Sequence, residues 1–288
     1  MKVWIDGRVV DGAEARIPVT DHGLLYGDGL FEGIRIARSR IFRLDAHLAR
    51  FATGAKALAL ELPGGLEGVR RVALETARAL GEPEAYLRLV LTRGEGALGL
   101  DPRTCPTPRL FCIGDRIRLY PAEKLDEGID LATSSLRRPP PDVLDPRVKS
   151  LNYLTGALAK LEAGQRQADE ALLLNAAGHI AEAAVANLFV VREGELLTPP
   201  ATDGALEGIT RATVLELAPR VGIPAREQTL GRFDLFAASE AFLTGSGAGL
   251  VPVKSLDGRP IGAGAPGPCF EKIRSAFADA TRELGVPW

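Results

Sequence analysis

Apolar positions along the chain follow two different periods. Residues 85–92 (AYLRLVLT) and 109–113 (RLFCI) are short apolar runs bounded by polar residues, a pattern typical of buried β-strands. Residues 44–60 carry apolar side chains at every third or fourth position, which predicts an amphipathic helix. The other expected elements are strands at 129–135, 170–174, 186–191 and 240–244 and helices at 66–80, 151–166, 209–219 and 269–284. The mixture indicates an α+β fold.

Turn signals divide this pattern into two parts. Residues 2–10 predict a strand, a turn at Asp6-Gly7 and a second strand. Between 114 and 147, a charged stretch and then Arg137-Arg138-Pro139-Pro140-Pro141 interrupt regular structure. We therefore expect a domain boundary near residue 120, with a smaller domain at 1–120 and a larger one at 121–288.

Composition limits the classes of function. A chain of 288 residues with 46% hydrophobic content can bury a large core. The net charge of −2 gives no bulk electrostatic reason to expect nucleic acid or membrane partners, and no apolar run reaches the roughly 18 residues of a membrane-spanning helix. We expect a soluble, cytoplasmic protein. The three cysteines and three histidines show no metal-ligand spacing, so we expect no metal site.

Reactive amines are few, because the chain has only seven lysines. Lys149 lies about thirty residues before Glu182 and just ahead of the helix expected at 151–166, where a helix N-terminus would disfavour an ammonium group. An amine followed by a carboxylate that leads into a hydrophobic strand is what pyridoxal-phosphate chemistry needs. The amine forms an imine with the cofactor, and the acid keeps the ring nitrogen protonated.

Pyridoxal phosphate also needs a phosphate site, and three segments offer one. Gly208-Ile209-Thr210-Arg211 opens the helix expected at 209–219, where free N–H groups and the Thr210 hydroxyl can meet an anion. In 244–249 (TGSGAG) alternating glycines follow a strand, and Arg50 could add a fixed charge. The glycine-rich run 26–33 has the wrong spacing for a dinucleotide site, with no clear strand leading into it.

Together these motifs resemble those of the class IV (fold type IV) aminotransferases. They are spread over nearly the whole chain in the family's order. The matching segments are 21–35 (DHGLLYGDGLFEGIR), Phe42-Arg43-Leu44 with His47 and Arg50, 149–153 (KSLNY), Glu182 with Asn187-Leu188-Phe189, and 208–211 (GITR).

The resemblance implies the fold, cofactor and partners. It implies a D-amino-acid-aminotransferase-like fold with a small N-terminal α/β domain, a larger C-terminal domain built on a β-barrel-like core, and pyridoxal 5′-phosphate held between them. It also implies a homodimer in which a loop of the partner subunit completes the substrate pocket. The substrates would be an amino acid and a 2-oxo acid, converted in two half-reactions.

Roles follow from the same resemblance. Lys149 is similar to the lysine that binds the cofactor and moves the proton, and Glu182 to the partner of the pyridine nitrogen. Tyr153 is similar to the phenol that bonds the ring oxygen. The residues similar to phosphate ligands are Arg50, Ile209, Thr210 and Ser246. The residues similar to substrate-pocket positions are Tyr26, Phe31, Gly33, Tyr86, Arg88, Gly247 and Ala248.

The substrate class stays open at this point. Residues 86–94 and 98–102 resemble branched-chain amino-acid aminotransferases, and the basic pair that D-amino-acid aminotransferases carry after Thr-Arg-Gly is replaced here by Glu95-Gly96-Ala97-Leu98. In contrast, residues 182–187 (EAAVAN) are closer to aminodeoxychorismate lyases. We expect branched-chain transamination, with a D-amino-acid or (R)-amine transaminase, or the lyase, as alternatives. A non-enzymatic or nucleotide-binding α/β protein is the alternative from another class.

Overall fold

The computed structural model describes residues 1–117 and 119–288, which form two compact units. Unit 1 comprises Met1–Ile117, Val148–Asn152 and Thr281–Trp288, and unit 2 comprises Arg118–Arg147 and Tyr153–Ala280. The sequence boundary near residue 120 falls beside this division. Two later segments differ from the expectation that all of 121–288 forms one domain, because 148–152 and 285–287 pair with strands of unit 1.

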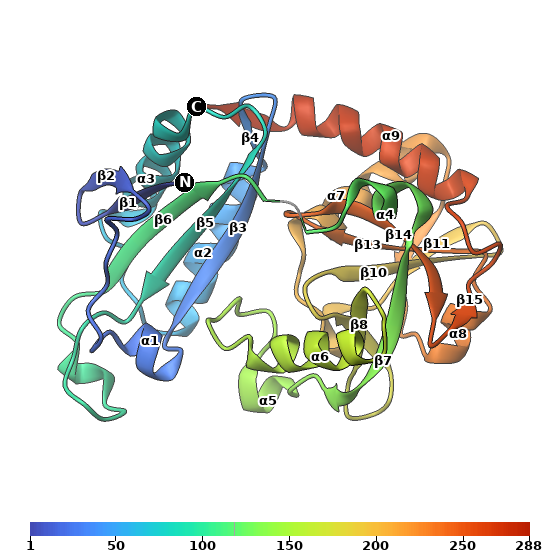
Figure 1. Ribbon diagram of the computed structural model, residues 1–288, viewed down its shortest axis with the longest axis horizontal. Helices are drawn as coiled ribbons and strands as arrows, with labels where there is room; N and C mark the ends of the chain where they lie inside the picture. Colours follow the sequence, from blue (N-terminus) through green and yellow to red (C-terminus); the bar gives the residue numbers. More distant parts are fainter. Residues whose placement is uncertain (118) are drawn as a thin grey trace. The chain divides into compact units, whose positions relative to one another are not determined.

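Unit 1 is built on a seven-stranded antiparallel sheet with helices against one face (Figure 1). The strand order is β16-β4-β3-β5-β6-β1-β2. The strands are β1 (Lys2–Ile5), β2 (Arg8–Asp11), β3 (Gly29–Ala37), β4 (Arg40–Phe42), β5 (Ala85–Thr92), β6 (Arg109–Asp115) and β16 (Gly285–Pro287). The helices are α1 (His22–Tyr26), α2 (Leu44–Ala57) and α3 (Gly65–Leu80).

The core of unit 1 forms where α2 and α3 meet the sheet. Leu44, Leu48 and Phe51 of α2 are buried, as their helical spacing predicts, against alternate residues of β3 such as Ile34. The opposite face of β3 carries Phe31 and Gly33. The strand β3 therefore packs into the core with one face and carries candidate site residues on the other.

Unit 2 is built on a curled nine-stranded sheet of mixed direction. The path is β12-β11-β10-β13-β14-β7-β8-β9, with β15 paired to β14. The strands are β7 (Ile129–Arg137), β8 (Glu170–Leu174), β9 (Ile180–Ala183), β10 (Asn187–Arg192), β11 (Glu195–Thr198), β12 (Ala225–Glu227), β13 (Glu240–Gly245), β14 (Gly249–Leu256) and β15 (Arg259–Pro260). The helices are α4 (Ala122–Glu127), α5 (Pro141–Leu144), α6 (Leu154–Gln165), α7 (Ile209–Leu217), α8 (Arg232–Phe236) and α9 (Pro268–Glu283), whose last residues cluster with unit 1.

Helix α6 packs through small residues instead of its leucines. Ala159 and Ala163 are buried against β7 and β8, whereas Leu154 and Leu161 are 70% and 60% exposed. Small side chains let the helix approach the sheet closely, so its leucine stripe faces outward. Among the described residues, no helix has the length and apolar character to cross a bilayer, and no cluster of three metal-ligand side chains occurs.

Candidate active site

Lys149 lies on a short extended segment at the edge of β3. Ser150 forms an antiparallel bridge with Leu30, and the Leu151 N–H donates a hydrogen bond to the Gly29 carbonyl oxygen at 2.9 Å. Helix α6 begins only at Leu154, five residues after Lys149, so the expectation that a helix N-terminus lies directly behind this amine is wrong. Pairing with β3 keeps residues 149–151 extended, and a helix dipole acts mainly within its first turn.

Four of the residues expected in the substrate pocket share one face of the unit 1 sheet. Phe31 and Gly33 alternate along β3, and Tyr86 and Arg88 alternate along β5, with Gly33 directly opposite Arg88. A Cβ at Gly33 would lie 1.9 Å from the Tyr86 hydroxyl, so only glycine leaves room for that ring. The Lys149 Nζ lies 4.4 Å from the centroid of the Phe31 ring on this unit. The result is an apolar surface with an amine beside it.

Arg88 places a second cation on this surface. Its guanidinium carbon lies 4.5 Å from the Phe31 ring centroid and 5.6 Å from that of Tyr86. In the part of the chain that the structure describes, Arg88 has no carboxylate partner, and its buried Nε has no hydrogen-bond acceptor. A cation that is flanked by aromatic rings and lacks an acid partner is suited to bind a ligand carboxylate.

Arg50 is held on the helix-covered side of β3 by a buried acid. Its Nε and Nη2 donate to the two oxygens of Glu32 at 2.7 and 2.8 Å. His47, one turn earlier on α2, donates from Nδ1 to Glu32 Oε2 at 2.7 Å, because a carboxylate can only accept. The His47 Nε2 is buried and has no partner among the described residues.

The charges in this cluster follow from burial and pairing. Burial alone would raise the pKa of Glu32, but the Arg50 charge and the His47 hydrogen bond outweigh it and lower that pKa to about 2. Burial lowers the pKa of His47, and this outweighs the opposing effect of its bond to Glu32. At neutral pH the cluster is therefore an ionised Glu32–Arg50 pair with a neutral imidazole.

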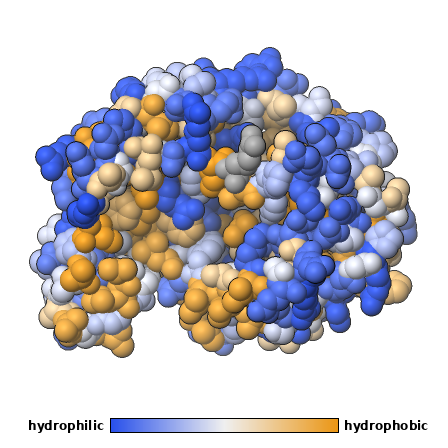
Figure 2. All heavy atoms as spheres, viewed as in Figure 1, coloured by the Kyte–Doolittle hydropathy of each residue, from blue (hydrophilic) through white to orange (hydrophobic). Residues whose placement is uncertain are grey.

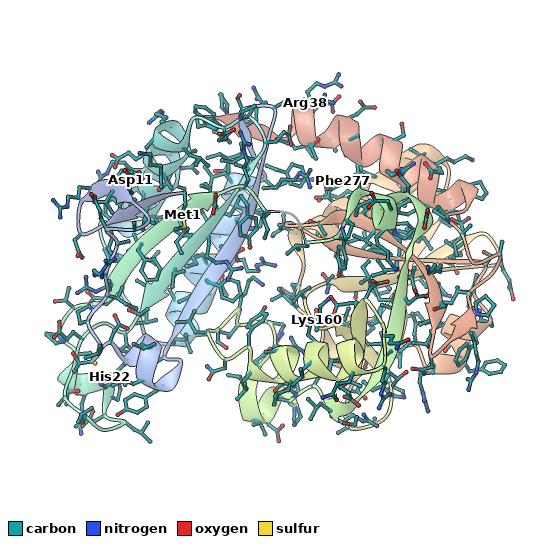
Figure 3. All side chains as sticks on the ribbon, in the orientation of Figure 1. Met1, Asp11, His22, Arg38, Lys160 and Phe277 are labelled. Atoms are coloured by element: carbon teal, nitrogen blue, oxygen red, sulfur yellow. The ribbon has the colours of Figure 1, made fainter. Side chains whose placement is uncertain are left out.

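Tyr26, another residue expected in the substrate pocket, lies on α1 and contacts the loop after β5. Its hydroxyl accepts a hydrogen bond from the Gly99 N–H at 2.9 Å, and its ring meets the edge of His22. His22, labelled in Figure 3, bonds through Nε2 to the Ala97 carbonyl oxygen at 2.9 Å. These contacts fasten α1 to the loop that carries Leu98 and Leu100.

Glu182 lies on β9 in unit 2 and is 5% exposed. Its Oε2 accepts hydrogen bonds from Asn187 Nδ2 and from the Leu206 N–H, both at 3.0 Å. Its Oε1 pairs with Arg138 Nη2 at 2.5 Å. Because each of these groups donates a hydrogen bond or carries positive charge, they favour the ionised form of the carboxylate.

The expected phosphate segments of unit 2 converge through Asn187. Helix α7 begins at Ile209 with Gly208 as its N-cap, as the sequence predicts, and Asn187 Nδ2 also donates to the Leu206 carbonyl oxygen at 2.9 Å. A Cβ at Gly208 would lie 1.9 Å from the Asn187 Oδ1. Asn187 also faces Thr244 across the β10–β13 ladder, just before the turn of Ser246, Gly247 and Ala248. The Asn187 side chain thus links the acid to the segment before α7, and its place in the strand ladder sets it opposite the start of the second segment.

These segments fit an anion. The first N–H groups of α7 lack partners within the helix, and they point toward its N-terminus. The Thr210 and Thr244 hydroxyls are buried and have no hydrogen-bond partner among the described residues. Buried hydroxyls are normally satisfied, so their state favours an external partner such as a phosphate group. Tyr153 lies directly before α6, as its N-cap residue.

Three residues beside these groups were missed or undervalued in the sequence. Arg138 falls in the Arg-Arg-Pro run that predicts only a break, and Glu32 is hidden among glycines. Asn187 falls in the motif Asn187-Leu188-Phe189, which by itself indicates no role for its side chain. The partners of Glu32 and Arg138 are distant in sequence, and no local pattern shows such pairs.

Comparisons with known proteins point to one family. The family described as "Amino-transferase class IV" matches residues 29–256. A putative branched-chain-amino-acid aminotransferase of Methanocaldococcus jannaschii is 44% identical over 288 residues, covering 99% of this chain and 98% of that protein. The crystal structure of the Escherichia coli branched-chain amino acid aminotransferase superposes with a TM-score of 0.93 at 33% identity, covering 96% of this chain and 93% of that one.

A third relative is known with a cofactor derivative. The T.th. branched-chain amino acid aminotransferase complexed with N-(5′-phosphopyridoxyl)-L-glutamate superposes with a TM-score of 0.91 at 35% identity, covering 98% of this chain and 94% of that one. The family match spans well over half of the chain, and the first relative is similar over nearly its whole length. The chain therefore belongs to the class IV aminotransferase family.

Proposed function

We propose that this protein is a pyridoxal-phosphate-dependent transaminase that moves an amino group between a branched-chain amino acid and a 2-oxo acid such as 2-oxoglutarate. The relatives reported above carry the branched-chain name at 33–44% identity over nearly the whole chain. The observation that carries the proposal is the unit 1 sheet face, where the Lys149 amine and the Arg88 cation lie against apolar Phe31.

The chain's own residues supply a full set of cofactor ligands in this proposal. Lys149 is the attachment point, Glu182 meets the ring nitrogen and Tyr153 the ring oxygen. The proposed phosphate ligands are Arg50, Ile209, Thr210 and Ser246. Bound pyridoxal phosphate would supply an aldehyde that condenses with amines and a protonated ring that accepts an electron pair.

Each residue then has a definite task. The Lys149 Nζ would hold the cofactor's aldehyde carbon and, as a free amine, would accept and donate a proton at the substrate α-carbon. The Glu182 carboxylate keeps a proton on the ring nitrogen through a charge-assisted hydrogen bond. Arg50 and the N-terminus of α7 fix the phosphate, so that the reacting atoms keep their orientation.

The proposed pocket suits two kinds of side chain. An aliphatic branched chain can bury its apolar surface against Phe31 and Tyr86. The distal carboxylate of a dicarboxylic substrate can pair with Arg88. The glutamate moiety of the ligand in the T.th. complex is consistent with such a substrate.

The D-amino-acid alternative receives less support from the arrangement. Arg93 follows β5, but its guanidinium is used by Asp28 and by the carbonyl oxygens of Leu58 and Ala59, at 2.6 to 3.1 Å. It is therefore occupied within unit 1 and is not presented to a substrate carboxylate. The lyase alternative depends on the Glu182-Ala183-Ala184 motif, which leaves the cofactor ligands unchanged.

A donor and acceptor matrix tests the proposal. Purified enzyme loaded with pyridoxal phosphate is assayed with L-leucine, L-isoleucine, D-alanine and (R)-1-phenylethylamine, each with 2-oxoglutarate and with pyruvate. We expect the highest kcat/KM with the two L-amino acids and 2-oxoglutarate. Turnover of D-alanine or the (R)-amine without turnover of L-leucine would contradict the branched-chain assignment, and pyruvate release from aminodeoxychorismate would favour the lyase.

We also propose a homodimer. Figure 2 shows apolar side chains gathered over α1 and its neighbouring loop, where Leu24, Leu98 and Leu100 are 59%, 81% and 78% exposed. Patches of this kind usually mark a protein interface. Light scattering should give twice the chain mass of 30.6 kDa, and Leu98→Asp with Leu100→Asp should weaken the dimer. A cytoplasmic location remains a prediction from the sequence.

A further inference from the structure

Arg138 is a charged group that binds Glu182 within unit 2. Its Nη2 lies 2.5 Å from Glu182 Oε1, and the two side chains are 12% and 7% exposed. The other oxygen of Glu182 accepts hydrogen bonds from neutral donors, the Asn187 amide and the Leu206 N–H. Arg138 therefore brings a full positive charge to this carboxylate from within its own unit.

The structure fixes Arg138 at several points. Its backbone N–H donates to the Leu174 carbonyl oxygen at 2.9 Å, and its Nε donates to the Gly204 carbonyl oxygen at 3.1 Å. Gly204 has a φ of +101°, and a Cβ there would lie 3.4 Å from the Cβ of Arg138. An arginine anchored at its backbone and at Nε offers its remaining N–H groups in one orientation. The ion pair is thus preorganised.

We propose that Arg138 is a positioning residue that holds Glu182 in its charged form, so that a proton shared between this acid and the cofactor's ring nitrogen stays on the nitrogen. The inference rests on the proposed function, in which Glu182 meets that nitrogen. A buried carboxylate without a charged partner gains affinity for protons, because burial disfavours its charged form. The ring would then lose its proton to Glu182 and accept electrons less well.

The size of the effect follows from the short distance. An opposite charge within about 4–6 Å shifts a protonation equilibrium by about ten- to a thousandfold. Removing the arginine charge should move the shared proton toward Glu182 by a factor in this range. Lysine at this position keeps the positive charge but loses the planar guanidinium. Arg138→Lys should therefore keep more of the shared proton on the ring nitrogen than Arg138→Gln does, but less than wild type.

The chain offers a matched control in the neighbouring arginine. Arg137 donates from Nη1 to the carbonyl oxygens of Ser134 and Ser135, both at 3.1 Å, and it pairs with no acid among the described residues. Arg137→Gln removes the same charge from the adjacent position without touching Glu182. A general loss of positive charge or of packing would affect both variants.

The test is the protonation state of the ring nitrogen. Pyridoxal phosphate labelled with nitrogen-15 in the ring is loaded into wild type, Arg138→Gln, Arg138→Lys and Arg137→Gln, and the nitrogen chemical shift is recorded at one pH. Circular dichroism checks the fold of each apo protein. We expect a protonated signal in wild type and Arg137→Gln, a shift toward the unprotonated position in Arg138→Gln, and an intermediate value in Arg138→Lys. The kcat of Arg138→Gln should fall at least about tenfold.

Several results would overturn the proposal. A protonated signal in Arg138→Gln equal to that of wild type would mean that Arg138 only supports the fold, whatever the activity does. If Arg138→Gln fails to fold, Arg138→Met takes its place, and a protonated signal equal to that of wild type in this uncharged variant would lead to the same conclusion. Failure of wild type itself to bind the labelled cofactor would contradict the proposed function instead, so the two failures are distinguishable.

Discussion

The backbone N–H of Phe31 donates a hydrogen bond to the carbonyl oxygen of Lys149 at 2.9 Å. This bond attaches the segment that carries Lys149 to the edge of β3. Phe31, the donor, is also the residue whose ring lies under the Lys149 amine. Lys149 is therefore attached to a strand of the sheet and not carried by a free loop. A reactive amine benefits from such a rigid base, because its reach toward a bound cofactor is then fixed.

Gly29→Ala should disturb this attachment. A Cβ at residue 29 would lie 2.5 Å from the Leu91 carbonyl oxygen and 2.8 Å from Leu151 Cδ1, so the backbone at Leu91 and the side chain of Leu151 must both move. We expect a loss of about 1–3 kcal/mol in the free energy of unfolding and weaker retention of pyridoxal phosphate. Urea unfolding and a spectroscopic cofactor titration measure the two effects. The control is Gly164→Ala, at an exposed helical position with open space around it. Wild-type behaviour of Gly29→Ala in both assays would refute this prediction.

Gly33→Ala should alter the substrate pocket more than the fold. The added methyl group would lie 1.9 Å from the Tyr86 hydroxyl, which can move outward with its ring. We expect kcat/KM for L-leucine to fall more than the affinity for pyridoxal phosphate, because the cofactor ligands lie on other residues. Steady-state kinetics and cofactor titration of the same preparation test this. Equal losses in the two quantities would show that the change spreads beyond the pocket.

Arg88→Gln should raise the KM for 2-oxoglutarate much more than the KM for pyruvate. The substitution removes the cation that has no acid partner among the described residues. Losing one charge-assisted contact costs about 1.5–3 kcal/mol, which corresponds to about a ten- to hundredfold rise in KM for 2-oxoglutarate. The KM for pyruvate, which has no distal carboxylate, should change little. A parallel rise for both acceptors would argue against Arg88 as the distal carboxylate contact.

Acid should destabilise the protein through the Glu32–His47–Arg50 cluster. The pKa of His47 is lowered, so its contribution to stability is present above pH 6.5 and is lost as the pH falls below that value. The contribution of Glu32, about 3 kcal/mol at about 1.4 kcal/mol per pKa unit, is present above pH 4.5 and is lost as the pH falls toward 2.

His47→Gln should therefore flatten the decline in the free energy of unfolding between pH 7 and 5. Urea unfolding of the apo protein at pH 7, 6 and 5 measures that slope. His179→Gln, at an exposed histidine, serves as the control and should leave it unchanged. An unchanged slope in His47→Gln would exclude this histidine as the source of the decline in the free energy of unfolding between pH 7 and 5.

Local patterns predicted much of the fold. Strands β5 and β8 have the bounds expected from the sequence, α3 differs from its expected range by one residue at its start, and α9 differs by one residue at each end. In α3 and α9 the apolar residues at helical spacing are also the ones that pack, and in β8 the whole short run is buried. The local sequence pattern was therefore sufficient to predict where these four elements lie.

Other elements depend on contacts that no local pattern contains. The helix expected at 151–166 starts only at Leu154, because residues 149–151 pair with β3, and it buries Ala159 and Ala163 and not its leucines. The strand β3 was missed because its glycines resemble a loop, whereas Gly29 and Gly33 are needed for close approach by neighbours. Motifs suggested Lys149 and Glu182 as site residues, but the Arg138 ion pair spans 44 positions and became visible only in the fold.

Reduction with borohydride followed by peptide mapping is the most direct test of the central claim that Lys149 carries the cofactor. The reagent converts the link between the lysine amine and pyridoxal phosphate into a stable bond, which mass spectrometry can locate. The account predicts one phosphopyridoxyl group, on the peptide that contains Lys149, and none in Lys149→Ala. A modified peptide containing any of the other six lysines, or no modification after loading with pyridoxal phosphate, would contradict it.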